Sequence, residues 1–379
     1  MKKIVVVGAG LAGLNATRIL TERGHHITLV ESSDRVGGRV ATDVIDGYRC
    51  DRGFQVINPR YPEIVASDVM KFLDFIPLPR AIDLLIDNHV ATARPGFASF
   101  FNSHFGSVTN KISILHYLRS SRSESAESVM LACGLGETYH RVLKPFLTGV
   151  FLTDPKNVSN EVARELVKSF IKSSPGIPAM GVGELPRNLA LPLHNILLNT
   201  RVDALTDRGV KTSAGFIEAD VVIVATDPTT ASQLLGMNSA PLMNSSTTWY
   251  HSIPEGVITS PRLRVDGLIV NSIAISHLSP YYAPAGRTLV SSTTITSTTE
   301  SEVRRQLANL WQCSTKNWEL VSKYEIKQSL PRHGVGKPIE SSVQVRENLY
   351  VIGDHRQIPS QQGAMASGRR AADLIDQGR

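Results

Sequence analysis

The run Ile4-Val5-Val6-Val7-Gly8-Ala9-Gly10-Leu11-Ala12-Gly13 joins a short β-branched stretch to a turn rich in glycine. Consecutive apolar β-branched residues are typical of a strand that is buried on both faces of a parallel sheet. A helix is expected to begin near Leu11, because apolar residues then recur with helical spacing as far as Leu20. Arg23-Gly24 supplies a stop, and Ile27 to Val30 gives a second strand. The N-terminal part of the sequence therefore predicts a βαβ unit.

Each glycine of this turn has a physical task in a dinucleotide site. Gly8 permits the tight turn, Gly10 lets the backbone approach a pyrophosphate, and Gly13 allows the helix to pack closely on the strand. Leu11-Ala12 begins the helix, whose unpaired N–H groups and positive dipole end favour phosphate charge. Glu31 follows about twenty residues later at a strand end, where its carboxylate can accept from ribose hydroxyls. This combination predicts a dinucleotide site but does not distinguish NAD from FAD.

The segment directly after Glu31 separates the two cofactors. Ser32-Ser33-Asp34-Arg35-Val36-Gly37-Gly38-Arg39 combines Arg35 and Arg39 with a glycine pair that lets the chain pass close to a large ligand. A site for NAD does not need this element. Here the sequence resembles the flavin-dependent amine oxidase superfamily, which also contains protoporphyrinogen oxidases and carotenoid desaturases. The resemblance implies FAD as the cofactor, bound in part by Arg35, Gly38 and Arg39, with Arg39 on the FAD phosphates.

Further segments of this superfamily follow in the expected order. Asp51-Arg52-Gly53-Phe54-Gln55-Val56 resembles phytoene-desaturase-like members, which are usually named only as FAD-dependent oxidoreductases. Asn199 to Asp203 resembles the strand on which a valine, here Val202, pairs with adenine through its backbone.

The C-terminal segment resembles the motif that closes the flavin site in this superfamily. Gly353-Asp354 ends a strand and precedes Ser360 to Gly368. The resemblance implies that Asp354 reaches the ribityl or phosphate region of FAD. It also implies that the helix beginning near Gly363 directs the amides of Gly363-Ala364-Met365 toward the flavin N1 and C2 carbonyl. Amide donors and a helix dipole at that edge stabilise negative charge.

Three distant strands are predicted to share one sheet, because Ala219 to Ala225 and Leu349 to Ile352 repeat the buried pattern of Ile4 to Val7. Ser291 to Ser301, which is rich in Ser and Thr, alternates like an exposed strand and turn. The predicted fold class is α/β, a Rossmann-type doubly wound FAD domain with an inserted mixed α+β substrate domain. The FAD domain is assigned to residues 1–75, 180–235 and 340–379, and the substrate domain to residues 76–179 and 236–339.

The composition excludes several classes of protein. The 379 residues are 42% hydrophobic and 20% charged, which allows a large buried core in about two or three domain-sized units. The net charge of +6 is spread without a basic run, which argues against a nucleic-acid partner. No apolar stretch reaches the roughly 18 residues of a membrane span, which leaves open only a peripheral contact with anionic lipid. Cys50, Cys133 and Cys313 fit neither a disulfide framework nor a metal site and favour a cytoplasmic location.

The expected reaction is hydride transfer from a C–H bond of an apolar or partly apolar small molecule to flavin N5, giving a C=C or C=N product. Many amine-oxidising members carry a lysine soon after the segment that matches Ala219 to Ala225. No lysine occurs between Lys211 and Lys316, which disfavours simple amines as substrates. No cysteine lies near the C-terminal motif to bind the flavin covalently, so we expect FAD to be bound non-covalently and to be dissociable. No second complete glycine triplet follows a strand, so oxygen, a quinone or another diffusible acceptor is expected to reoxidise the flavin.

Two other functions remain open. A non-redox flavin mutase of a sugar nucleotide has a similar nucleotide loop and needs arginines for a diphosphate. Its candidates here are Arg262, Arg264 and Arg287, which also fit the pattern of solvated residues on strands. A non-catalytic binding protein like the GDP-dissociation inhibitors has this fold with degraded FAD motifs. The retained Glu31, Arg39 and Asp354 argue for a bound cofactor and against the non-catalytic binding protein.

Several other residues have both a functional and a structural interpretation, and no catalytic side chain is identified. His355 is either close to the flavin edge or a polar cap of its loop. The aromatic residues of the insertions either line a substrate pocket or belong to the core: Phe146, Phe151, Trp249, Tyr250, Tyr281 and Tyr282. The oligomeric state is left open.

Overall fold

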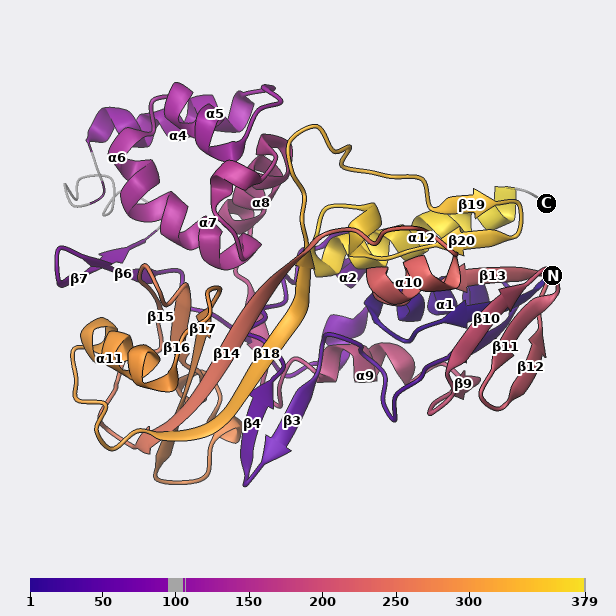
Figure 1. Cartoon of the computed structure of the whole chain (residues 1–379). Coiled ribbons are helices and arrows are strands. Elements are labelled where there is room, and N and C mark those ends of the chain that lie inside the picture. Colours follow the sequence, from indigo (N-terminus) through magenta and orange to yellow (C-terminus); the bar gives the residue numbers. More distant parts are fainter. Residues whose placement is uncertain (95–104, 106, 378–379) are drawn as a thin grey trace.

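A computed structural model describes residues 1–94, 105 and 107–377. The predicted ranges 76–179 and 340–379 also include residues 95–104, 106 and 378–379, which lie outside the described residues. Figure 1 shows an α/β part that holds the N-terminus and the helix at the C-terminal end, a sheet with two long strands, and a cluster of helices. No helix in the described ranges is long and apolar enough to cross a membrane.

The α/β part is built on a six-stranded sheet with the order β19-β20-β13-β1-β2-β9. The strands from β20 to β9 are parallel, and β19 pairs with β20 in the antiparallel direction. The distant β-branched runs therefore lie side by side, as predicted. The strand bounds are β1 (Lys3–Val7), β2 (His26–Val30), β9 (Ile196–Leu197), β13 (Val221–Val224), β19 (Gln344–Arg346) and β20 (Leu349–Val351).

Different elements cover the two faces of this sheet. Helices α1 (Leu11–Glu22), α9 (Glu184–Ala190) and α12 (Gln361–Gln377) pack on one face and share a core with it. The other face packs against helix α10 (Pro228–Leu234) and the antiparallel strands β10 (Val202–Thr206), β11 (Gly209–Thr212) and β12 (Gly215–Glu218). The α/β fold class is confirmed. It differs from pure double winding because antiparallel strands share the second face with a helix.

The second sheet has seven strands in the order β18-β14-β17-β16-β15-β6-β7. Helix α11 (Glu300–Trp311) packs on one face through a core that contains Trp249 and Val290. The long strands β14 and β18 run from this sheet toward the α/β part (Figure 1). The strand bounds are β6 (Ile82–Ile86), β7 (His89–Ala93), β14 (Met243–Pro254), β15 (Leu263–Val265), β16 (Asn271–Ala274), β17 (Arg287–Thr294) and β18 (Glu319–Pro331).

A cluster of helices with its own core completes the inserted segments. Its members are α4 (Val108–Arg119), α5 (Ala126–Ala132), α6 (Gly136–Thr138), α7 (Lys144–Phe151) and α8 (Asn160–Lys172). Short elements join the parts of the molecule: β3 (Thr42–Ile45), β4 (Tyr48–Asp51), α2 (Pro62–Ala66), β5 (Phe75–Pro77) and β8 (Gly176–Pro178). Every strand of the six-stranded sheet lies in the ranges assigned to the FAD domain, and every strand of the seven-stranded sheet lies in the other ranges. The exact boundaries stay a prediction.

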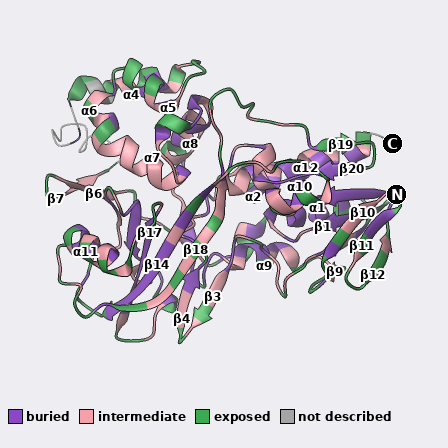
Figure 2. Ribbon diagram, viewed as in Figure 1, coloured by how far each residue is buried: buried purple, intermediate pink, exposed green. Residues whose placement is uncertain are grey.

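The expectation that Ser291 to Ser301 forms an exposed strand and turn is wrong for the strand, although Thr296 and Ser297, which follow it, are exposed. Ser291 to Thr294 belong to β17, and none of them is more than 2% exposed. Ser292 and Ser272 bring their hydroxyl oxygens within 2.9 Å, and the indole N–H of Trp249 donates to Thr294 at 3.2 Å. Bonds across strands satisfy the hydroxyls of Ser292, Thr293 and Thr294 but not that of Ser291, so a mostly paired polar strand can occupy the middle of a buried sheet. Figure 2 shows this buried character along β14 and β17.

Candidate functional site

The glycine turn lies where β1 ends and α1 begins. Gly8 has φ of +104°, which glycine adopts without strain, and a Cβ on Gly13 would stand 2.0 Å from the carbonyl oxygen of Gly8. Beside Gly10 there is no heavy atom within 4 Å of a notional Cβ, so this side of the turn is open. No acidic residue or side-chain cap occupies the first turn of α1. The turn therefore presents backbone amides and a positive helix end to an approaching anion.

Glu31 ties the glycine turn to the end of β2. Its Oε2 accepts the N–H of Ala9 at 2.8 Å, while Oε1 accepts the N–H of Ser33 at 2.9 Å. Oε1 also accepts from Ser33 Oγ at 2.8 Å and from Ser32 Oγ at 3.3 Å, so the about four acceptor positions of the carboxylate are all used within the chain, two of them by hydroxyls that can rotate away. Next to it, the N–H of Thr200 donates to the backbone oxygen of Glu31 at 2.8 Å, two residues before Val202. The predicted ribose and adenine positions are thus close together.

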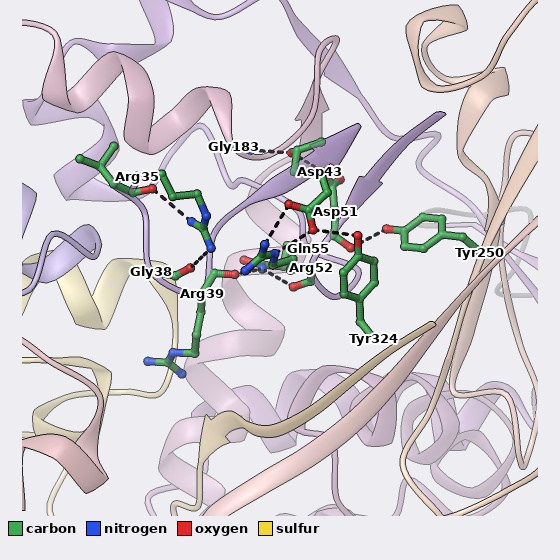
Figure 3. Close-up of polar contacts among 12 residues, drawn as sticks. Arg35, Gly38, Arg39, Asp43, Asp51, Arg52, Gln55, Gly183, Tyr250 and Tyr324 are labelled. Carbon is green, nitrogen blue, oxygen red and sulfur yellow. Dashed lines mark hydrogen bonds and ion pairs between the residues drawn. The ribbon is translucent and has the colours of Figure 1, made fainter. Parts of the chain in front are cut away.

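Arg39 joins three distant segments of the chain. Its guanidinium donates to Asp354 Oδ1 at 2.7 Å and to the carbonyl oxygen of Ser329, near the end of β18, at 2.9 Å. Asp354 is 4% exposed, and Arg39 compensates its charge. Arg35 takes another course, because it donates to the carbonyl oxygens of Val36 and Gly38 at 3.2 Å each. The two predicted arginines therefore differ. Arg39 reaches distant segments of the chain, whereas Arg35 bonds within its own loop, as its contact with Gly38 in Figure 3 shows.

The C-terminal segment that begins at Gly353 contacts Arg39 through Asp354. Gly353 donates its N–H to Ser367 Oγ at 2.8 Å, which holds the end of β20 against α12. The N–H groups of Gly363 and Ala364 donate to the side chain and backbone of Ser360 at 2.9 and 3.0 Å. Both of these predicted amide donors are therefore occupied within the chain. A Cβ on Gly363 would meet the carbonyl oxygen of Ile358 at 1.9 Å, so this glycine is needed for the loop itself.

Gln361, the first residue of α12, carries a polar atom that the described chain leaves without a partner. Its Oε1 is buried without a hydrogen-bond partner, and its Nε2 lies 3.4 Å from Gln55 Oε1. Gln55 in turn donates to the backbone oxygen of Arg39 at 2.9 Å. Met365, the third predicted amide position, is fully buried in the core between α12 and the sheet. The polar face of the site is thus formed by Arg39, Gln55 and Gln361.

A buried carboxylate that sequence reasoning assigned no role joins this site to the seven-stranded sheet. Asp51, at the end of β4, is 1% exposed. It accepts hydrogen bonds from Thr42 Oγ1 at 2.5 Å, Tyr282 OH at 2.8 Å and the N–H of Val182 at 3.1 Å. Burial raises the pKa of Asp51 to about 6, although these three bonds act in the opposite direction. Its backbone oxygen accepts from Tyr250 OH at 2.9 Å.

A second carboxylate, that of Asp43, lies on β3, the strand that pairs with β4. Asp43 accepts from Arg52 at 2.8 and 3.0 Å and from Tyr324 OH at 2.8 Å (Figure 3). The Arg52 hydrogen bond is the main reason that the pKa of Asp43 lies below its usual value. In the sequence, the only sign of these hydrogen bonds around Asp51 and Asp43 is that Asp51-Arg52 stands directly before Gly53, at the end of a strand. The partners come from residues up to 281 positions away, and no local pattern reveals them.

The other candidate residues lie in the core, in the hydrogen-bond network of Asp51 or at the surface. Tyr250 and Tyr282 are buried with their hydroxyls on Asp51, Trp249 packs under α11, and Phe151 belongs to the core of the helices. Phe146 packs edge-on against Phe170, with ring centroids 5.1 Å apart, and Tyr281 is 54% exposed. Cys50, Cys133 and Cys313 are free thiols, and burial raises the pKa of Cys50 to about 12.

Comparison with known proteins gives similarity at two scales. Over 73 residues the chain is 47% identical to the L-amino-acid oxidase of Bungarus fasciatus, and over 73 residues it is 44% identical to that of Pseudechis australis. Each match covers 19% of this chain and 14% of the relative. The chain thus matches only a small part of the length of these curated relatives.

Solved structures share the fold over nearly the whole chain. An oxidoreductase from Methanosarcina mazei superposes with a TM-score of 0.79 at 16% identity, covering 98% of this chain and all of the other. Reduced UDP-galactopyranose mutase gives 0.74 at 16% identity over 100% and 94% of the two chains. Putrescine oxidase bound to putrescine gives 0.71 at 15% identity over 99% of each.

The glycine turn, Glu31, Arg39 and the unpartnered Oε1 of Gln361 match the polar groups that a flavin dinucleotide requires. The flavin containing amine oxidoreductase family matches residues 11–376, almost the entire length of the chain. This protein therefore belongs to the flavin containing amine oxidoreductase family, whose cofactor is FAD.

Proposed function

We propose that this protein is an FAD-dependent oxidoreductase that removes a hydride from a C–H bond of a small, apolar or partly apolar molecule. The observation that carries the proposal is the position of Arg39, which connects the loop after β2, the end of β20 and the end of β18. Both sheets therefore meet at one polar centre. A substrate held on the seven-stranded sheet would there lie beside a cofactor held on the six-stranded sheet.

We assign the cofactor contacts as follows. The amides of the turn from Gly8 to Gly13 and the start of α1 bind the phosphates, Glu31 accepts from the ribose, and the backbone of Val202 meets adenine. Arg39 neutralises phosphate charge while Asp354 holds its guanidinium in place. When bound, FAD supplies the hydride acceptor. The buried Oε1 of Gln361 is free to accept a hydrogen bond from the cofactor.

The segment after Asp51 supports an apolar reaction chamber. A Cβ on Gly53 would stand 3.1 Å from Ile326 Cδ1 on β18, so the backbone at Gly53 lies against the seven-stranded sheet. Phe54 and Val56 are partly buried against the same core as Tyr324. Apolar walls that exclude water strengthen the electrostatic action of the few polar groups that remain. We propose a C=C or C=N product and oxygen, a quinone or another diffusible molecule as the electron acceptor.

The arginines that would serve a sugar-nucleotide mutase are engaged within the protein. Arg262 pairs with Asp83 at 2.8 Å, and Arg264 donates to the carbonyl oxygen of Leu310 at 2.7 Å. Arg287 donates to Ser252 and Glu319, at 2.8 and 2.7 Å. Although reduced UDP-galactopyranose mutase shares the fold, these pairings favour a redox function over the mutase alternative. The intact nucleotide site likewise disfavours a non-catalytic carrier.

Helix α4 offers a place for peripheral contact with lipid, which we propose as the setting of an apolar substrate. Val108, Ile112 and Leu115 lie on one helical face and are 43%, 52% and 54% exposed. Such a stripe inserts shallowly into a lipid interface. Sedimentation with anionic vesicles, compared with an Ile112→Ser variant, tests this contact. The free thiols agree with a cytoplasmic location.

The visible spectrum of the purified protein tests the central proposal. Flavin bands that bleach with dithionite and return in air establish a redox flavoprotein, and the speed of return separates an oxidase from a dehydrogenase. Protein that shows no flavin bands even after addition of FAD would refute the proposal. An anaerobic panel of amines, amino acids and unsaturated apolar compounds then identifies the substrate class by bleaching of the same bands.

A further inference from the structure

A cavity of about 270 Å³ lies outside the proposed FAD site. It is enclosed by α10, the loop from Pro331 to Ser341 after β18, and the loop from His355 to Pro359 after β20. None of the residues assigned above to FAD lines it. The cavity therefore belongs to a different binding surface, although His355 directly follows Asp354 in the chain.

One side of this cavity is basic. Its cations are Arg332, Lys337 and Arg356, and no aspartate or glutamate among the described residues lines it. His333 and His355 line it as well, but burial lowers the pKa of both imidazoles. Arg332 Nε donates to Asn244 Oδ1 at 2.9 Å, and Lys337 Nζ donates to the backbone oxygen of Arg332 at 2.9 Å. Both residues are exposed, so their remaining N–H groups can reach a ligand. A concave wall with cations and no carboxylate attracts anions, because little opposite charge offsets the local field.

The nearest carboxylates are already engaged elsewhere. Asp227 caps α10 by accepting the N–H groups of Thr229 and Thr230 at 3.0 Å each. Asp354 pairs with Arg39, and Glu340 accepts from Gln357 Nε2 at 3.0 Å. None of these three acids lines the cavity. The cations that face the cavity are left without an acidic partner inside it.

Unsatisfied polar atoms lie in the same wall. Nδ1 of His333, Nδ1 of His355 and Nε of Arg356 are buried and have no hydrogen-bond partner. Burial lowers the pKa of His355 to about 4, and the nearby Arg356 and Arg39 act in the same direction. Buried polar atoms without partners reduce stability, and these three belong to residues that line the cavity.

The opposite side of the cavity is apolar. Ala231, Leu235 and Met237 face it from α10 and the turn that follows, and Val351 and Pro359 contribute from the other side. A second cavity of about 220 Å³ shares Pro331, Arg332, His333 and Pro359 as walls and reaches the helices at Phe151 and Val162. An inorganic anion would leave this apolar surface without contacts.

We propose that this cavity binds a small amphipathic anion, in which an apolar body carries a carboxylate or a phosphate. The charged group contacts Arg332, Lys337 and Arg356, and the apolar body packs on Leu235 and Met237. This site is independent of the oxidoreductase proposal, since it uses none of the residues assigned to FAD.

Calorimetric titration of the FAD-loaded protein tests the site. The probes are octanoate and octyl phosphate, compared with octanol, which lacks the charge, and with inorganic phosphate, which lacks the apolar body. We expect one molecule of octanoate or octyl phosphate to bind per chain, at least tenfold more tightly than octanol or inorganic phosphate. The tighter of the two identifies the charged group. The flavin bands should show that FAD stays bound throughout.

Variants locate the binding within the molecule. Arg356→Met and Arg332→Met should each weaken binding of the tighter probe at least tenfold, because each loses a charged hydrogen bond. Arg346→Met, which removes an exposed arginine paired with Asp207, should leave it unchanged. If Arg356→Met does not fold, the exposed Arg332 decides the question alone. The proposal is overturned if neither probe binds, if octanol or inorganic phosphate binds equally well, or if the cavity variants retain wild-type affinity.

Discussion

Replacing Asp51 with Asn should remove a pH dependence of stability that this buried carboxyl imposes. Burial raises the pKa of Asp51 to about 6 in the folded protein, against about 3.9 in an unfolded chain. The folded state thus holds this proton more tightly, so the stabilisation is complete below pH 3.9 and is lost as pH rises through 6. Between about pH 4.5 and 7 the loss from this group is about 2 kcal/mol.

The assay is urea unfolding at these two pH values, followed through tryptophan fluorescence. Trp249, Trp311 and Trp318 all lie in the core of the sheet that Tyr250 and Tyr282 anchor to Asp51. The unfolding free energy of the wild type should fall by about 2 kcal/mol more than that of Asp51→Asn on going to pH 7.

A matched variant with the opposite sign controls for general effects of pH. The pKa of Asp43 is lowered, first by its hydrogen bond from Arg52, so Asp43 contributes stability above its unfolded pKa that is lost on acidification. Asp43→Asn should therefore lose stability relative to the wild type at pH 7 and less at low pH. If Asp51→Asn and the wild type change equally between the two pH values, the reasoning about Asp51 is refuted.

Further predictions concern the cofactor site. Arg39→Met should lower FAD affinity, which fluorescence titration with FAD measures. It should also destabilise the fold by about 3 kcal/mol in urea unfolding, because it leaves the buried Asp354 unpaired. Gly13→Ala should abolish flavin retention on purification, since its Cβ would stand 2.0 Å from Gly8 O, whereas Gly267→Ala, with open space around it, should retain flavin normally. Glu31→Ala should weaken FAD binding about tenfold, since it removes a charged acceptor and frees the turn at Ala9; unchanged affinity would contradict the assigned role.

Local patterns sufficed for the elements of the nucleotide-binding sheet. The β-branched run before Gly8 and the helical spacing after Leu11 each report a preference of a few neighbouring residues, and the structure has β1 and α1 there. The strands β13 and β20 lie where their buried runs predicted them. A parallel strand with both faces covered leaves little choice of residue type, so its composition reveals it.

Other features depended on contacts between distant residues. The Ser- and Thr-rich strand β17 can be buried because partners on β14 and β16 satisfy most of its hydroxyls, and polarity alone does not report this. Likewise, Ser360 occupies the amides of Gly363 and Ala364, which the motif predicted as donors to the flavin.

By itself, the sequence determined the fold class, the nucleotide turn and the family, because these depend on short-range periodicity and on backbone constraints at a few glycines. Only the tertiary structure decided that Arg39 bridges Asp354 and Ser329, that Asp51 binds Tyr282 and Val182, and that three cationic residues line a separate cavity. Such groups come from segments more than a hundred residues apart. Their burial and pairing follow from how the segments pack, which no local stretch encodes.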